Sequence, residues 1–126
     1  MTFSEAVKSG FDHYTKFDGR AGRRAYWWWF LFAILVGIGA NIIDAILGSF
    51  GVVSGLAALA LLLPGLSVAI RRLHDINRSG WWILIFIVPI VGFILWLVWF
   101  LREGDPGEND YGPPPAAGAA PIAGTA

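Results

Sequence analysis

Two long stretches of this chain are almost free of ionisable side chains. Between Ala25 and Ile70 the only such residue is Asp44, and between Trp81 and Leu101 there is none. Charged residues make up 14% of the chain, against roughly a quarter in average globular proteins. A soluble domain of 126 residues could not bury so much apolar surface, because small domains have little interior. The sequence therefore predicts an integral membrane protein.

Composition also excludes several kinds of site and partner. The nine Lys and Arg residues balance the nine Asp and Glu residues, so no overall positive field favours nucleic acid as a partner. The chain has no cysteine, which excludes disulfides and thiolate ligands. The remaining ionisable residues offer no set of ligands at metal-binding spacing. We expect no metal and no cofactor.

Three apolar segments are each long enough to cross a bilayer: 25–47, 52–70 and 81–101. A helix of about 20 residues spans a hydrocarbon core of about 30 Å, and helices satisfy their own backbone groups. The short connection Gly48–Gly51 makes the first two segments a tight hairpin. The predicted fold is an all-α membrane protein with three transmembrane helices. Residues 1–115 form one membrane domain, and residues 116–126, mostly Ala, Gly and Pro, are predicted to be disordered.

The segment before the first span has the features of an amphipathic helix. Thr2 and Glu5 have the spacing of a capping box. Apolar and aromatic residues then recur at helical spacing, at Phe3, Val7, Phe11 and Tyr14. These features favour an interfacial helix that lies in the headgroup layer, and the alternative is a frayed, solvated terminus.

The basic residues predict an orientation. They precede the first span and occupy the loop 71–80, and the main ones are Arg20, Arg23, Arg24, Arg71, Arg72 and Arg78. By the positive-inside rule this face is cytoplasmic, so the N-terminus is cytoplasmic and three spans put the C-terminus in the periplasm. The alternative is a re-entrant hairpin folded at Pro89–Gly92, which would return the tail to the cytoplasm. The 21 residues of 81–101, at about 1.5 Å each, favour a full crossing.

The loop 71–80 also contains the residues most suited to catalysis. His74 beside Asp75 could be a general base with its orienting carboxylate, but adjacent side chains rarely face each other on a regular element. No nucleophile or carboxylate cluster accompanies them. We therefore expect no enzyme. The arginines of the loop are expected to contact anionic lipid headgroups, while His74 and Asp75 bond to the loop backbone.

Asn41 and Asp44 are the polar candidates inside the first span. They share a helix face with Ala33 and Gly37 at steps of four, four and three. Polar side chains at membrane depth can form a transport site, and small residues permit close helix packing or self-association. Asp44 lies about one turn from the end of the span, which favours a hydrated position at its rim.

Three motifs together resemble one family. Residues 17–27 resemble F-x-G-R-x-x-R-x-x-Y-W, residues 71–82 resemble R-R-L-H-D-x-x-R-S-G-W-W, and residues 104–112 resemble G-x-x-G-x-N-x-Y-G. These are the motifs of the domain-of-unknown-function 805 family. The resemblance implies a small bacterial inner-membrane protein, and it brings no established activity, cofactor or catalytic residue. Ala25 and Asn77 depart from the Glu and Gly often found in that family.

Three functions compete at this point. The first is a non-enzymatic inner-membrane protein that acts through its cytoplasmic basic face on anionic lipid or on a partner protein. The second is a small transporter or channel component, in an oligomer, that uses Asn41 and Asp44. The third is a membrane-bound enzyme that depends on His74 and Asp75. The sequence favours the first, because the basic residues gather on one face while the parts of a catalytic site are missing.

Overall fold

The computed structural model describes residues 2–115, and nearly all of the regular structure there is helical. In chain order the elements are α1 (Phe3–Asp12), α2 (Arg23–Leu47), α3 (Val52–Asp75), the 3-10 helix η1 (Gly80–Ile87) and α4 (Pro89–Leu101). The described part has no β-strand beyond an isolated bridge between Asn109 and Gly112. The predicted disorder of residues 116–126 lies outside the described residues.

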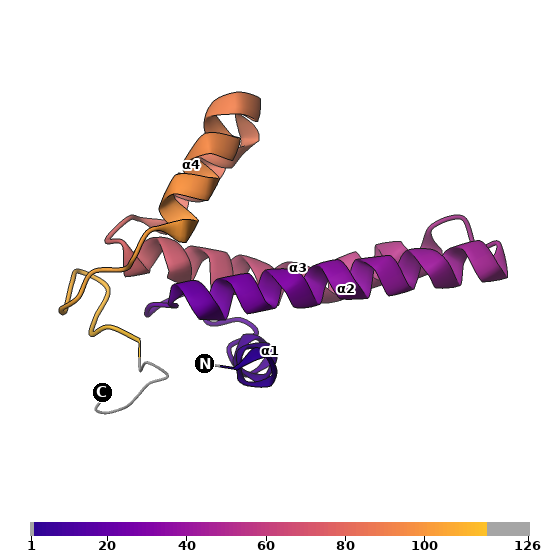
Figure 1. The fold of residues 1–126 in the computed structure, drawn as a ribbon, viewed down its shortest axis with the longest axis horizontal. Helices are drawn as coiled ribbons and strands as arrows, with labels where there is room; N and C mark the ends of the chain where they lie inside the picture. Colours follow the sequence, from indigo (N-terminus) through magenta and orange to yellow (C-terminus); the bar gives the residue numbers. More distant parts are fainter. Residues whose placement is uncertain (1, 116–126) are drawn as a thin grey trace.

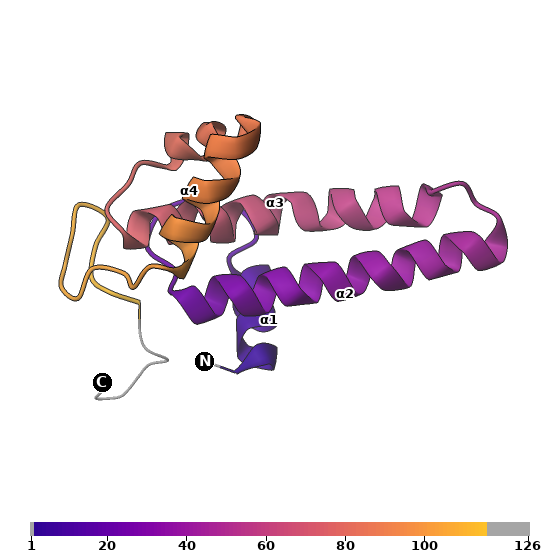
Figure 2. The same cartoon turned by 45° about the horizontal axis from the view of Figure 1, so that its top comes forward.

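The longest elements, α2 and α3, lie side by side as an antiparallel hairpin (Figures 1 and 2). The turn between them has glycines with positive φ at Gly48 (64°) and Gly51 (87°), a conformation that residues with a Cβ rarely adopt. Both helices are long and apolar enough to cross a membrane. The all-helical class and the first two predicted segments are therefore confirmed as helices of spanning length.

The N-terminal helix forms as predicted and docks on the hairpin. The Thr2 side chain accepts from the Glu5 amide at 3.2 Å while the Glu5 carboxylate accepts from the Thr2 amide at 2.7 Å. The aromatic edge of α1 packs on α2, with Phe3 against Trp28 and Phe11 against Trp29 at 5.7 and 5.1 Å between ring centroids. Figure 1 shows α1 nearly end-on while α2 and α3 run across the view, so α1 crosses the hairpin.

The prediction of one continuous third span is wrong. Residues 81–101 divide at Val88 into η1 and α4, and Pro89 is the first residue of α4. A Cβ added at Gly92 would lie 2.7 Å from the Phe86 Cα, so only glycine lets the two elements pack this closely. They form a second, shorter hairpin that projects from the first (Figures 1 and 2). The 13 residues of α4 extend about 20 Å, too short to cross a core of about 30 Å.

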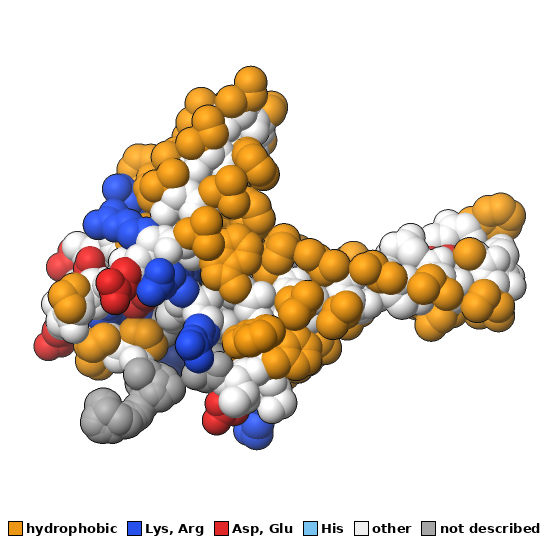
Figure 3. All heavy atoms as spheres, viewed as in Figure 1, with side chains coloured by type: hydrophobic (Ala, Val, Ile, Leu, Met, Phe, Trp, Pro, Cys, Tyr) orange, Lys and Arg blue, Asp and Glu red, His pale blue; other side chains and the backbone are white. Residues whose placement is uncertain are grey.

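The surface of the helices is mainly apolar, and the charged side chains gather at one end of the molecule. Large apolar side chains are exposed along α2, α3 and α4 (Figure 3), as on Ile46, Leu59 and Ile90. The buried apolar residues gather where the two hairpins meet, among them Trp29, Leu73 and Phe100. Lys, Arg, Asp and Glu side chains lie mostly beside this junction. This arrangement suits a chain that has lipid around its apolar helices and water at its charged end.

Candidate functional site

A buried carboxylate between two arginines organises the charged end. Asp75 Oδ1 accepts from Arg20 Nε at 3.0 Å, and Asp75 Oδ2 accepts from Arg72 Nη1 at 3.0 Å. The three side chains are between 0% and 4% exposed. We call Arg20, Arg72 and Asp75 the arginine–aspartate cluster. Charges so deeply buried stabilise a structure only when they are paired and hydrogen-bonded.

The arginines of this cluster also bind the backbone that follows α4. Arg20 Nη1 donates to the carbonyls of Gly107 (2.7 Å) and Gly112 (3.1 Å), and its Nη2 donates to that of Asp105 (2.6 Å). Arg72 Nη2 donates to the carbonyls of Trp99 and Arg102. Burial lowers the pKa of Arg72 to about 10, so it stays protonated at neutral pH. The described part of the tail therefore packs at the same end of the molecule as the start of α2 and the end of α3.

His74, at the end of α3, contacts both the segment before α2 and the tail after α4. Burial lowers the pKa of its imidazole, and Nδ1 lies 2.9 Å from the Gly19 carbonyl, to which it donates. The face of the imidazole ring stacks on Tyr111, with 4.0 Å between ring centroids and parallel planes. Asn109 Nδ2 donates to the His74 carbonyl at 2.9 Å. His74 and Asp75 thus bind different partners, and no hydrogen bond joins them within residues 2–115.

Sequence reasoning missed the residues of the tail that complete this site. A Cβ added at Gly104 would overlap the Asp75 carboxylate, so the chain passes the cluster at a position where only glycine fits. The Asp105 amide then donates to the Asp75 carbonyl at 2.8 Å. The spacing of Gly104, Asn109 and Tyr111 in the third motif was the available signal.

The six arginines predicted to form one basic face divide into two groups. Arg20, Arg71 and Arg72 are buried, and the guanidinium of Arg78 lies 4.4 Å from the ring centroid of Trp99, a cation–π contact. Arg23 and Arg24 remain exposed. Arg23 Nη1 donates to the Leu101 carbonyl at 3.2 Å, while no hydrogen bond of the Arg24 side chain is found among the described residues.

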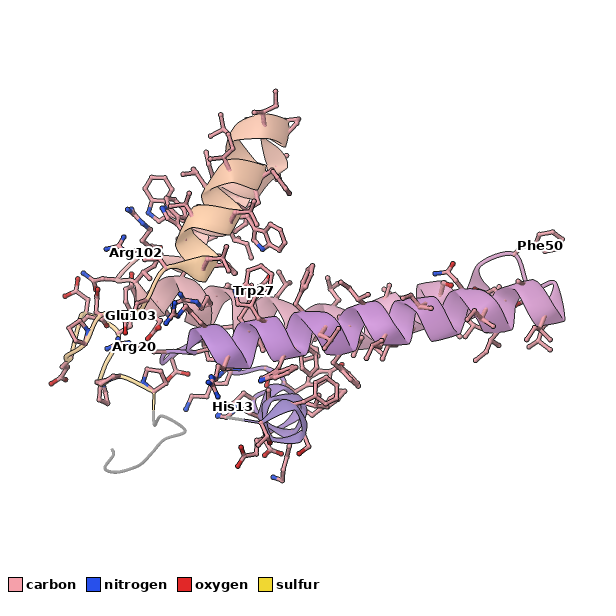
Figure 4. The ribbon with its side chains drawn as sticks, viewed as in Figure 1. His13, Arg20, Trp27, Phe50, Arg102 and Glu103 are labelled. Carbon is pink, nitrogen blue, oxygen red and sulfur yellow. The ribbon has the colours of Figure 1, made fainter. Side chains whose placement is uncertain are left out.

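These two exposed arginines line an amphipathic groove of about 570 Å³, which we call the groove. Its lining residues are Arg23, Arg24, Trp27, Trp28, Leu31 and Leu101. The spacing of four between Arg23, Trp27 and Leu31 puts them on one face of α2. Trp27 Nε1 donates to the Phe100 carbonyl at 2.8 Å, which holds the α4 wall against the α2 wall. Figure 4 labels Trp27 on α2 at the junction with α4.

Asn41 and Asp44 do not form a common site. Asp44 accepts from the Val53 and Ser54 amides at 2.9 Å each, and from the Ser49 and Ser54 hydroxyls at 2.5 and 2.7 Å. Its carboxylate therefore caps the start of α3 from the end of α2. Asn41 Nδ2 donates to the Gly37 carbonyl of its own helix at 2.8 Å.

Replacing Asp44 with Ala is expected to destabilise the hairpin by about 0.5–2 kcal/mol, the usual cost of losing a cap. Thermal unfolding in detergent measures the loss, and amide exchange at Val53 and Ser54 localises it. Asn41→Ala is the matched control, because its side chain bonds only within α2. Equal stability of the two variants would contradict the capping role.

The model of the family described as "Protein of unknown function (DUF805)" matches residues 14–113. Inner membrane protein YhaI of Escherichia coli (strain K12) is 46% identical over 108 residues, which cover 85% of this chain and 92% of that protein. Inner membrane protein YhaH of the same strain is 36% identical, with 82% and 89% covered. No solved structure matches the chain significantly.

Proposed function

This chain belongs to the DUF805 family, and from that premise we propose that it is a non-enzymatic inner-membrane protein that binds anionic phospholipid at its cytoplasmic end. The observation that carries the proposal is the groove, in which two exposed arginines precede tryptophan and leucine side chains on one helix face. Its relatives YhaI and YhaH are named inner membrane proteins.

The proposed topology has two spans and one re-entrant hairpin. All nine Lys and Arg residues lie outside residues 25–70, and the tip 48–51 carries no charge. The positive-inside rule then makes the charged end cytoplasmic. The hairpin of η1 and α4 starts and finishes at that end, which supports a cytoplasmic position for residues 104–115 as well. Backbone at membrane depth that is not α-helical must be covered by protein; α3 and α4 both pack against η1, and none of its residues is fully buried.

The groove matches the parts of a phospholipid in order. Arg23 and Arg24 lie in the first turn of α2, at the water boundary of the apolar segment, where guanidinium groups bind phosphate oxygens. Trp27 and Trp28 follow one turn deeper, at a depth typical of interfacial aromatic rings. Leu31, another turn deeper, then offers an apolar surface to an acyl chain, while Leu101, whose carbonyl accepts from Arg23, forms the opposite wall at the level of the arginines. A headgroup phosphate and its chain thus meet partners of the right chemistry at successive depths.

The double variant Arg23→Gln and Arg24→Gln is expected to weaken binding of phosphatidylglycerol at least about tenfold, because a hydrogen bond to a charged group contributes about 1.5–3 kcal/mol. Native mass spectrometry of the detergent-solubilised protein with one lipid at a time measures this. Micelles free of other anionic lipid remove the general attraction of a charged membrane surface.

The control is the double variant Lys8→Gln and Lys16→Gln, which removes two positive charges from the same end without touching the groove. It should bind phosphatidylglycerol as the unmodified protein does. Zwitterionic phosphatidylethanolamine should bind weakly to all three proteins. Undiminished phosphatidylglycerol binding by the arginine variant would overturn the proposed function.

A further inference from the structure

A second hollow, with a volume of about 730 Å³, adjoins the groove and shares Arg23 and Arg24 with it. It lies between the start of α2, the end of α3 and the chain that follows α4; Arg71, Gly22, Ala25, Glu103 and Pro114 are among its lining residues. We call it the headgroup cavity. It is the place into which the polar end of a lipid in the groove would extend.

Arg71 is a buried cation that lines this cavity. Its side chain is part of a residue only 5% exposed, and its Nε donates to Ser67 Oγ at 3.2 Å. Its two terminal nitrogens have no hydrogen bond, and the guanidinium has no ion pair, among the described residues. Asp18 acts on it electrostatically from beyond ion-pairing distance. Neither terminal nitrogen is among the fully buried unpaired atoms of the described residues, which are Arg72 Nε and Arg78 Nε, so the unbonded end of Arg71 is accessible from the cavity that it lines.

The start of α2 adds a second group that favours an anion. Its N-cap is Gly22, which provides no side-chain acceptor, and the first turn contains no acidic residue. The backbone amides of Arg23, Arg24 and Ala25 have no acceptor in the described part of the chain. Free amides and the helix dipole together favour phosphate at such a terminus.

The carboxylates around the cavity do not neutralise the positive charge of Arg71 and of the first turn of α2. Asp75 is paired with Arg20 and Arg72, and Asp105 Oδ2 accepts from Asn109 Nδ2 at 3.0 Å. Glu103 is exposed, and no ion pair of its side chain is found among residues 2–115. With Arg20 and Asp75 paired to each other, the lining leaves Arg23, Arg24 and Arg71 opposite the carboxylates of Glu103 and Asp105.

We propose that the groove and the headgroup cavity together bind a lipid whose headgroup carries two phosphates in series, a lipid diphosphate. The inference rests on the proposed function, since the first phosphate is the one bound by Arg23 and Arg24. The second phosphate then reaches Arg71 and the free amides of α2. A lipid whose two phosphates each carry their own acyl chains fits less well, because its second phosphate stays at the membrane surface.

The test compares dioleoyl phosphatidic acid with dioleoylglycerol pyrophosphate, two lipids with the same chains that differ by one phosphate. In native mass spectrometry we expect the diphosphate to bind about tenfold more tightly, which is the effect of one charge-assisted hydrogen bond. Ala25→Glu puts a carboxylate in the cavity and should abolish this preference while phosphatidic acid still binds. Ala25→Gln, of the same size without the charge, should keep it.

The outcomes separate the two proposals. Equal binding of both lipids, or a preference that survives Ala25→Glu, overturns the diphosphate inference and leaves the proposed function intact. Failure of both lipids to bind overturns the proposed function as well. Inorganic pyrophosphate that binds as tightly as the lipid diphosphate would overturn the assignment to a lipid. Misfolding is not expected for Ala25→Glu, because an acid in the first turn is favoured by the helix dipole, and the thermal midpoint checks this.

Discussion

Replacing Asp75 with Asn is expected to lower the free energy of unfolding by about 3–5 kcal/mol, the usual cost of removing one partner of a buried ion pair. Asn has nearly the same shape as Asp, so the loss comes from charge and not from a cavity. Arg20 and Arg72 would keep buried positive charges with no carboxylate between them. Unfolding by SDS in mixed micelles, followed by tryptophan fluorescence, measures the change.

The matched control is Glu108→Gln, which removes one negative charge from an exposed position of the same tail. Its unfolding free energy should stay within about 0.5 kcal/mol of the unmodified protein, as for most surface substitutions. Similar small effects for both variants would show that the Asp75 carboxylate is not needed by the arginines.

The second large effect concerns the side of the membrane that the tail occupies. A fluorescent protein fused after Pro115 is expected to be bright, and alkaline phosphatase fused at the same residue is expected to be inactive. The reason is that Arg20 and Asp75 bind the chain between Gly104 and Gly112, so the tail shares a side with the basic end. Whole-cell fluorescence and phosphatase activity show whether the fused reporter lies in the cytoplasm or in the periplasm.

The internal control is the same pair of reporters inserted at Ser49, in the turn between α2 and α3. There the result should reverse, with active phosphatase and no fluorescence, because the turn is at the other end of both spans. Active phosphatase after Pro115 would instead support three full spans and would contradict the packing of the tail seen here.

Helices α2 and α3 were predictable because their signal is local. A run of apolar residues between charged flanks fixes α2 and α3 regardless of the rest of the chain. The capping box of Thr2 and Glu5 is equally local, and the structure contains it. The structure does not test the prediction that α1 lies in the headgroup layer, because that position depends on a membrane and not on neighbouring residues.

Two prolines within the predicted apolar segments have different outcomes in the structure. Pro64 lies inside α3, and the helix continues through it, while Pro89 begins a new helix after a reversal. The difference lies in the glycines that accompany them. A Cβ at Gly65 would make only ordinary contact with Trp29, at 3.7 Å, whereas one at Gly92 would collide with the backbone at Phe86. The reversal therefore depends on close packing of Gly92 against the backbone at Phe86, which a length of 21 residues does not reveal.

The candidate site was only half predictable for the same reason. Its arginines and the His74–Asp75 pair were evident as a dense polar loop, but their acceptors are backbone carbonyls of the tail. Every residue has a backbone carbonyl, so a sequence pattern cannot show which carbonyls accept these hydrogen bonds. The glycines that make room for the tail can be identified in the sequence, and Gly104 is the clearest of them.

The hydrogen bonds of Arg20 have a consequence for biosynthesis. This residue binds Asp75, 55 positions later, and the Gly112 carbonyl, 92 positions later. The α2–α3 hairpin contains all of its own residues once Asp75 has been translated, but the last acceptor of Arg20 exists only when the ribosome has passed Gly112. The set of acceptors at the charged end is therefore complete only after Gly112 has been translated, and a nascent chain that stops earlier leaves Arg20 without all of them.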